Sequence, residues 1–350
     1  MIQELQDIQT TAGGIFAEGV AVSFGNDEAA ITATQEGVAI YDRTHWGRIE
    51  VSDSDRLRFL HNQSTNDFNI LKPGEGCDTV FVTSTARTID LATAYITENS
   101  VILLVSPLRR KKLMQWLDRY IFFADKVKLT DITEKTAAFS LIGPESNALL
   151  EKLGVTEIIK QPNNSHQVLS LDGNEIRIAV GSGLTTVGYT LIVAAENAAK
   201  VWQLLTTAGA IPLGDRLWEQ LRIEQGRPTP DQELTEDYNP LEAGLWQTIS
   251  FNKGCYIGQE TIARLNTYKG VKVQLWGVQL DAPTEPETII TLGEEKIGKI
   301  TSYTKTKQGH FALAYIRTKA GGKGLKVQVG ETQGEVVDIP FASRGYLENE

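Results

Sequence analysis

One octapeptide, KGCYIGQE at residues 253–260, combines the residue types that thiol chemistry needs. It contains Cys255, one of the two cysteines of the chain, two residues after Lys253. A nearby cation and the start of a helix both stabilise a thiolate, the reactive form of cysteine, and residues 259–265 place apolar side chains at helical spacing. The pattern predicts a catalytic Cys255 that Lys253 activates. A small buried apolar cysteine is the alternative that these residues leave open.

The octapeptide resembles the signature of the YgfZ-type tetrahydrofolate-binding proteins. These proteins are relatives of the glycine-cleavage T-protein, an aminomethyltransferase, and serve iron–sulfur enzymes. The resemblance covers most of the chain, and its other segments are FL at 59–60, STND at 64–67, PLGDRL at 212–217, LRIEQGRP at 221–228, NPLEAGL at 239–245 and TIAR at 261–264. The octapeptide is specific to the YgfZ branch, whereas the segments upstream of it are common to the superfamily.

The resemblance implies a cofactor and a function. It implies that the chain binds tetrahydrofolate or a one-carbon derivative and supports the assembly or repair of iron–sulfur clusters in client proteins, with Cys255 essential. The glutamate tail of folate carries carboxylates, which arginine binds bidentately, and the resemblance assigns Arg222 to that tail. A salt bridge between Arg222 and Glu219 on a helix surface is the alternative.

Further candidates for the folate site follow from the same resemblance. A pterin ring is flat and needs a slot with aromatic and apolar walls and a few fixed hydrogen-bond partners. Asn66 and Asp67 could instead serve a simple turn, and the aromatic candidates could be core residues. The six candidates are Asn66, Asp67, Asp90, Tyr95, Tyr238 and Trp246.

Two departures separate the chain from the T-protein pattern. Residues 86–91, ARTIDL, contain one acid, Asp90, where the T-protein has a glycine pair and adjacent aspartates. At residues 188–190, GYT, Thr190 stands where the T-protein has a glutamate. A carboxylate fixed near the reacting nitrogen is the natural electrostatic catalyst of aminomethyl transfer, so we expect that reaction to be absent. A glycine-cleavage aminomethyltransferase and a thiol-based redox or binding module remain the two alternatives.

Composition narrows the class of protein. The 350 residues carry a net charge of −10, which predicts no general attraction for nucleic acid or for an anionic membrane. Four scattered histidines and two cysteines form neither a metal-ligand pattern nor a disulfide framework. Residues 1–13 lack the apolar core of a signal peptide, and the longest aliphatic run, residues 101–105, is too short to cross a bilayer. We therefore expect a cytoplasmic protein or one of an organelle stroma or matrix.

The elements that position these residues predict an α+β fold. Residues 1–270 alternate strand and helix patterns, which predicts T-protein-like folate-binding domains of sheets with covering helices, with a subdomain boundary between about 134 and 135. Ser106-Pro107 predicts a helix start within this region. Residues 271–350 have strand patterns without an intervening helix, which predicts a C-terminal all-β barrel.

Overall fold

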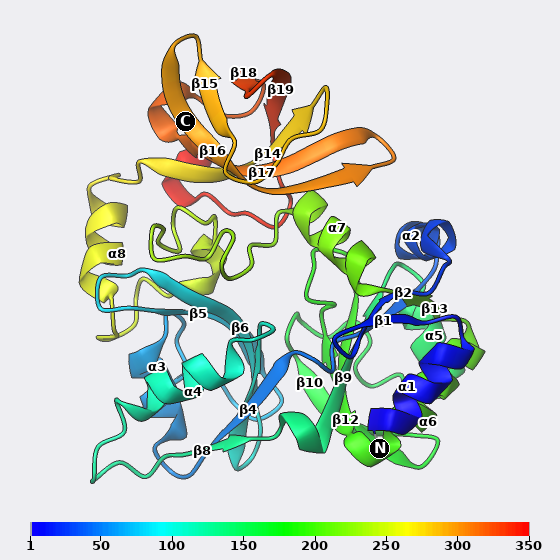
Figure 1. Ribbon diagram of the computed structural model, residues 1–350. Helices are drawn as coiled ribbons and strands as arrows, with labels where there is room; N and C mark the ends of the chain where they lie inside the picture. Colours follow the sequence, from blue (N-terminus) through cyan, green and yellow to red (C-terminus); the bar gives the residue numbers. More distant parts are fainter. Residues whose placement is uncertain (1, 350) are drawn as a thin grey trace. The chain divides into compact units, whose positions relative to one another are not determined.

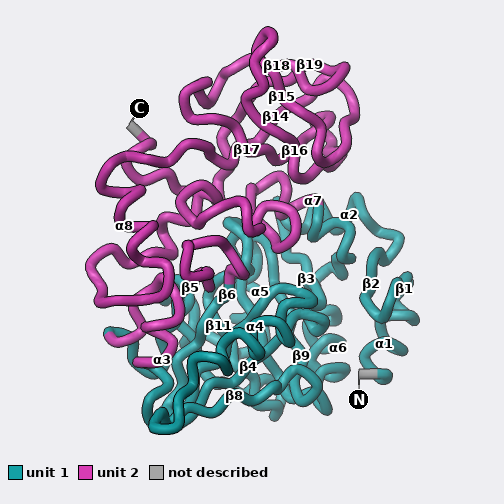
Figure 2. Tube along the Cα trace, turned by 60° about the vertical axis from the view of Figure 1, so that its left-hand side comes forward, with its two compact units in different colours: residues 1–57, 70–78, 92–219 teal, residues 58–69, 79–91, 220–350 magenta. Residues whose placement is uncertain are grey.

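The computed structural model describes residues 2–349, which form two compact units (Figure 2). Unit 1 comprises residues 1–57, 70–78 and 92–219, and unit 2 comprises residues 58–69, 79–91 and 220–350. Strands β5 (Gly76–Val82) and β6 (Thr88–Ile96) contribute residues to both units. The units are thus discontinuous in sequence, and domain boundaries at residues 134/135 and 270/271 stay a prediction.

The core of unit 1 is a six-stranded sheet covered by helices (Figure 1). Its order is β10-β11-β12-β9-β3-β13, and only the β13–β3 pair among these is parallel. Helices α1 (Ile2–Thr11), α5 (Ser146–Lys152) and α6 (Ala198–Ala208) bury apolar side chains in the same cluster as the sheet. The strands are β3 (Ala39–Asp42), β9 (Thr136–Ile142), β10 (His166–Leu171), β11 (Asn174–Val180), β12 (Gly188–Ala194) and β13 (Ile211–Leu213).

A second sheet has the order β5-β6-β7-β4-β8, with β4 (Gly47–Ser52), β7 (Ser100–Val105) and β8 (Lys128–Asp131). Helix α4 (Arg110–Asp118) contacts β4 and β8. The predicted helix start at Ser106 is wrong, because Leu108 has a left-handed backbone (φ 63°) that a helix cannot contain. The remaining elements of unit 1 are β1 (Ile15–Ala17), β2 (Val20–Ser23), α2 (Asp27–Glu36), η1 (Thr133–Lys135) and η2 (Ala195–Asn197).

Residues 273–337 of unit 2 form a closed six-stranded barrel, as predicted. Its order is β14-β17-β16-β15-β18-β19, and aliphatic side chains such as Val278, Ile300 and Val336 fill it. The strands are β14 (Val273–Leu280), β15 (Ile289–Leu292), β16 (Glu295–Thr306), β17 (Gly309–Arg317), β18 (Lys326–Val329) and β19 (Thr332–Val337). The α+β fold with a C-terminal barrel is therefore confirmed.

The remaining helices include α3 (Arg56–Gln63), which carries His61, and α7 (Asp215–Gln225), which carries Arg222. The others are η3 (Trp246–Thr248), α8 (Gln259–Thr267), η4 (Thr318–Ala320) and η5 (Gly345–Asn349). Helix α8 begins at Gln259, within the octapeptide, where the sequence predicts it. No helix within residues 2–349 has both the length and the apolar character needed to cross a membrane.

Candidate active site

Lys253 is a buried cation that holds the octapeptide against the end of α3. Its side chain is 7% exposed, and Nζ donates hydrogen bonds to the carbonyl oxygens of His61 (2.5 Å), Ser64 (2.8 Å) and Asn66 (2.5 Å). Carbonyl groups in the last turn of a helix have no partner within the helix, so the ammonium satisfies groups that the fold leaves open. Nζ also lies 4.6 Å from the centre of the Tyr256 ring. Lys253 therefore joins two segments that are far apart in sequence.

Cys255 lies at the surface, two residues beyond this buried cation. The segment that carries it is fixed on both sides, because the Ile257 N–H donates to the Asn62 carbonyl at 3.0 Å. Gly258, which precedes α8, has φ 81°, and a β-carbon there would lie 2.8 Å from the Thr83 carbonyl oxygen. Only glycine fits that position without strain. The fold thus presents an exposed thiol on a well-anchored segment.

His61 is a site residue that the sequence did not reveal. It is 6% exposed, and its Nδ1 lies 3.0 Å from Asp67 Oδ1. Burial lowers the pKa of His61 below its ordinary 6.5, the Lys253 charge lowers it further, and Asp67 partly opposes both. A neutral ring whose Nδ1–H faces the carboxylate keeps the lone pair of Nε2 available as a proton acceptor.

The free edge of the His61 ring faces the octapeptide. Its Nε2 lies 3.7 Å from the point where a β-carbon on Gly254 would sit, and Gly254 immediately precedes Cys255. An accessible thiol, a proton-accepting imidazole and a carboxylate that orients the imidazole are the parts of a thiol nucleophile.

Within residues 2–349, no group of three or more His, Cys, Asp or Glu side chains is arranged to hold a metal ion.

Asn66 and Asp67 both lie at this site, as part of the turn after α3. The Asn66 side chain accepts the Asp67 N–H at 2.8 Å, and Asp67 Oδ1 accepts the Asn69 N–H at 3.0 Å. These bonds are ordinary turn chemistry. In addition, the Asn66 carbonyl binds Lys253 and the Asp67 carboxylate orients His61. Four of the predicted residues, 66, 67, 253 and 255, are therefore brought together.

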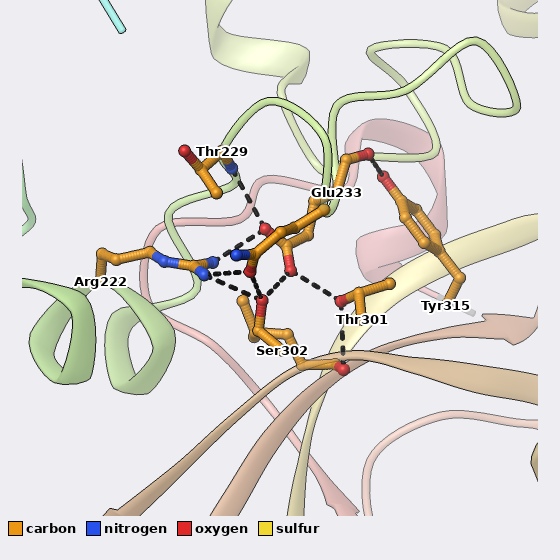
Figure 3. Close-up of polar contacts among 8 residues, drawn as sticks. Arg222, Thr229, Glu233, Thr301, Ser302 and Tyr315 are labelled. Atoms are coloured by element: carbon orange, nitrogen blue, oxygen red, sulfur yellow. Dashed lines mark hydrogen bonds and ion pairs between the residues drawn. The ribbon is translucent and has the colours of Figure 1, made fainter. Parts of the chain in front are cut away.

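Arg222 belongs to a different cluster, which lies between α7 and the barrel strand β16 (Figure 3). The side chain is 2% exposed, and Nη1 donates to Glu233 Oε2 at 2.8 Å while Nη2 donates to Ser302 Oγ at 2.9 Å. Gln232 accepts a further bond from Nη2. Arg222 and Glu233 thus form a buried ion pair.

The Glu233 carboxylate is surrounded by donors (Figure 3). Its Oε2 also accepts the Thr229 N–H at 3.1 Å, and its Oε1 accepts the hydroxyls of Thr301 at 2.7 Å and Ser302 at 2.5 Å. Buried charges are stable in a fold only when they are paired and hydrogen-bonded in this way. The geometry therefore supports a structural role for Arg222, whose guanidinium is committed to internal partners.

Tyr238 packs on the same cluster. Its ring stacks on Tyr315 with 3.5 Å between ring centres, and the Tyr315 hydroxyl donates to the Glu233 carbonyl at 2.8 Å. Burial, reinforced by nearby carboxylates, raises the pKa of Tyr238 to about 12. The ring thus packs against Tyr315 on β17.

The other three candidates lie in cores. Trp246 donates from Nε1 to the Leu241 carbonyl at 3.1 Å and packs edge-on against Tyr346. Asp90 is buried in the part of β6 that belongs to unit 2. Tyr95 is buried in unit 1, with its ring 5.4 Å from that of His166. Of the three, Trp246 belongs to the cluster of buried residues against which Tyr256 of the octapeptide packs.

Comparison with known proteins identifies the family. The family model for the GCVT N-terminal domain matches residues 15–253, more than half of the chain. The chain belongs to the GCVT family. A GCVT-family fold is also seen in the glycine cleavage system aminomethyltransferase T of Bartonella henselae, a crystal structure that superposes with a TM-score of 0.86 at 18% identity over 97% of this chain and 98% of that one.

Two proteins are similar to this chain over nearly its whole length. The Arabidopsis thaliana protein named "Putative transferase At1g60990, chloroplastic" is 49% identical over 343 residues, which are 97% of this chain and 79% of the relative. The aminomethyltransferase of Bacillus mycoides is 27% identical over 343 residues, 92% of each chain. The family assignment therefore extends over nearly the whole chain.

Proposed function

We propose that this GCVT-family protein is of the YgfZ type, binds tetrahydrofolate or a one-carbon derivative, and supports the assembly or repair of iron–sulfur clusters in client proteins. Cys255 is its reactive group. The observation that carries the proposal is the exposed Cys255 thiol on a segment that Lys253 anchors and that the His61 imidazole faces. A thiol placed beside a proton acceptor suits chemistry on sulfur.

The site that would catalyse aminomethyl transfer in a T-protein is altered in this chain. Thr190, on β12, is buried and donates its hydroxyl to the Gly181 carbonyl at 2.8 Å. A hydroxyl that is engaged in this way supplies no negative charge for a developing cation. This difference supports a function other than aminomethyl transfer.

The residues that the resemblance assigns to folate differ in how well their contacts suit a folate site. Arg222 does not fit a clamp for the glutamate tail, because its guanidinium is held by Glu233, Gln232 and Ser302. Asn66 and Asp67 keep polar groups beside the octapeptide and remain candidates. Tetrahydrofolate when bound would supply a carrier for one-carbon groups, and the proposed role of Cys255 does not depend on it.

Titration with tetrahydrofolate tests the ligand. We expect saturable quenching of tryptophan fluorescence and matching heats in calorimetry. A chain that gives neither signal is not a folate-binding protein, and the thiol-based redox or binding module then becomes the better account. Oxidation of Cys255 by peroxide, in a protein that has no affinity for folate, would support a redox or binding module.

Turnover of an aminomethylated lipoyl carrier tests the enzyme alternative. With Thr190 in place of a glutamate, we expect ammonia release at the background rate. Robust release would make the protein a glycine-cleavage aminomethyltransferase.

The partners expected from the resemblance are folate and iron–sulfur client proteins, and the net charge of −10 predicts neither nucleic acid nor a membrane among them. The chloroplastic location given in the name of the Arabidopsis relative supports an organelle stroma among the compartments expected from the sequence. Recovery of an iron–sulfur enzyme with the tagged protein after crosslinking would test the client class.

A further inference from the structure

Unit 1 exposes two adjacent phenylalanines. In the connection between α4 and β8, the Phe122 side chain is 69% exposed and that of Phe123 is fully exposed. This connection projects away from α4 and β8 (Figure 1). Single exposed apolar residues are common on protein surfaces, but contiguous large ones mark an interaction site.

The exposure of these rings is imposed by the backbone. The Phe122 N–H donates to Asp125 Oδ2 at 2.8 Å, and the Asp125 N–H donates to the Phe122 carbonyl at 2.9 Å, which closes a tight turn with Phe123 at its corner. The end of the connection is anchored in turn, because Lys126 and Asp55 exchange hydrogen bonds of 2.9 and 3.0 Å. A turn that is closed at both positions keeps the phenyl rings in water rather than letting them fold onto the sheet.

The segment that contains the turn is basic. Residues 109–128 contain seven basic and two acidic side chains, a local charge of +5 in a chain of net charge −10. Five of the basic side chains are exposed: Lys111, Lys112, Arg119, Lys126 and Lys128. Their charge is complementary to an anionic surface. Although the whole chain is acidic, this segment is a local exception.

We propose that the Phe122–Phe123 turn docks unit 1 on an anionic lipid surface. The two phenyl rings enter the headgroup region, and the exposed basic side chains nearest in sequence, Arg119, Lys126 and Lys128, lie against lipid phosphates. An exposed apolar turn within a basic segment fits a deformable bilayer, whereas a protein partner would need a pocket shaped to receive both rings. The docking is peripheral and reversible, since it uses two rings and no spanning helix.

Sedimentation of the full chain with lipid vesicles tests this proposal. We expect binding to vesicles of phosphatidylcholine with about 30 mol% phosphatidylglycerol, little binding to phosphatidylcholine alone, and release at high salt. The double variant Phe122→Ser/Phe123→Ser should bind at least about tenfold more weakly. Lys126→Glu/Lys128→Glu should lose the preference for anionic vesicles. Both variants should keep the thermal midpoint of the wild type, because the altered side chains are exposed.

Val187→Ser is the matched control, because Val187 is also in unit 1 and is 59% exposed, but lies outside the basic segment. It should bind vesicles like the wild type. The proposal is overturned if the wild type ignores anionic vesicles, in which case an acidic protein with an apolar pocket is the better occupant. It is equally overturned if the double phenylalanine variant binds as tightly as the wild type.

Discussion

Arg222 and Lys253 are both buried cations of unit 2, yet their surroundings differ in kind. Arg222 faces the buried carboxylate of Glu233. That carboxylate also accepts a hydroxyl of β16 and the backbone N–H of Thr229, which lies in the loop after α7. Lys253 instead donates hydrogen bonds to three main-chain carbonyl oxygens within residues 61–66. The first cluster is closed on itself, whereas the second borders an exposed thiol and the Nε2 edge of His61.

The difference shows how similar sequence signals lead to different roles. Both cations stand in segments that resemble family motifs, and the sequence predicts that Arg222 binds the folate tail and that Lys253 activates Cys255. Arg222 is hydrogen-bonded to internal partners and stabilises the fold. Lys253 also fixes the backbone beside an exposed thiol, so it sets the geometry of a site. The predictions below test this contrast, in order of decreasing effect on stability.

The largest effect is expected from Arg222→Leu. It leaves the Glu233 carboxylate buried without its cation, which should lower the free energy of unfolding by about 3–5 kcal/mol. Urea unfolding measures the loss. The double variant Arg222→Leu/Glu233→Leu should recover part of it, since no unpaired charge then remains.

An exposed ion pair provides the control for Arg222. Arg317 and Glu295 are 3.2 Å apart and both about half exposed, so Arg317→Leu should leave the unfolding midpoint almost unchanged. Equal stability of Arg222→Leu and the wild type would contradict the closed-cluster interpretation.

A smaller loss is expected from Lys253→Met. Three carbonyl groups lose their donor, and unmet carbonyls cost less than an unpaired buried carboxylate, so the cost should be about 2–4 kcal/mol and below that of Arg222→Leu. The same unfolding series measures it. A cost greater than that of Arg222→Leu would reverse the ranking of the two clusters.

The pKa of His61 should report the charge of Lys253. Because burial and the Lys253 charge both lower this pKa, the Lys253→Met variant should titrate His61 closer to 6.5 than the wild type does, as read from imidazole proton shifts in NMR spectra. An unchanged pKa would mean that the ammonium does not act on the ring.

Stability should follow the same titration. The unfolded chain binds the His61 proton more readily than the folded one, so the contribution of the neutral ring is complete above about pH 6.5 and is lost as the pH falls toward the folded pKa. In His61→Gln, this part of the decline on acidification should disappear. If the stability of His61→Gln falls with pH as steeply as that of the wild type, groups other than His61 cause the decline.

The smallest effect on stability is expected from Cys255→Ser. The side chain is exposed, so the free energy of unfolding should change by less than about 0.5 kcal/mol. In the native protein, Cys255 should also react with iodoacetamide before Cys77, which is buried on β5. Timed alkylation read by mass spectrometry checks this order, and earlier reaction of Cys77 would contradict the exposed position of Cys255.

Local patterns in the sequence predicted local structure well. The strand patterns of residues 271–350 and the helix after Gly258 were sufficient because each depends on the spacing of neighbouring residues. The helix start at Ser106 failed where a single left-handed residue, Leu108, overrode a favourable cap pair. Helix α2, with a small and mostly alanine- and threonine-based buried face, was not predicted because its apolar stripe is weak.

The site was predictable only in part. The octapeptide identified Cys255, but Lys253 binds the carbonyl of a residue 192 positions away, and no local pattern announces such a contact. His61 is a candidate because its Nδ1 lies beside the Asp67 carboxylate and its Nε2 lies close to Gly254. The sequence around His61 indicates neither of these contacts. The sequence did not indicate the partners of Arg222 either, since Glu233 lies 11 positions away and Ser302 lies 80 positions away.

The central claim is that Cys255 is the functional group of the protein, and complementation tests it most directly. A strain without its own YgfZ-type protein would receive the wild type, Cys255→Ser or Cys77→Ala at matched levels, and the activity of an iron–sulfur enzyme would be measured. We predict that the wild type and Cys77→Ala restore the activity, whereas Cys255→Ser, although equally stable, does not. Full restoration by Cys255→Ser would contradict the claim and reduce Cys255 to a surface residue.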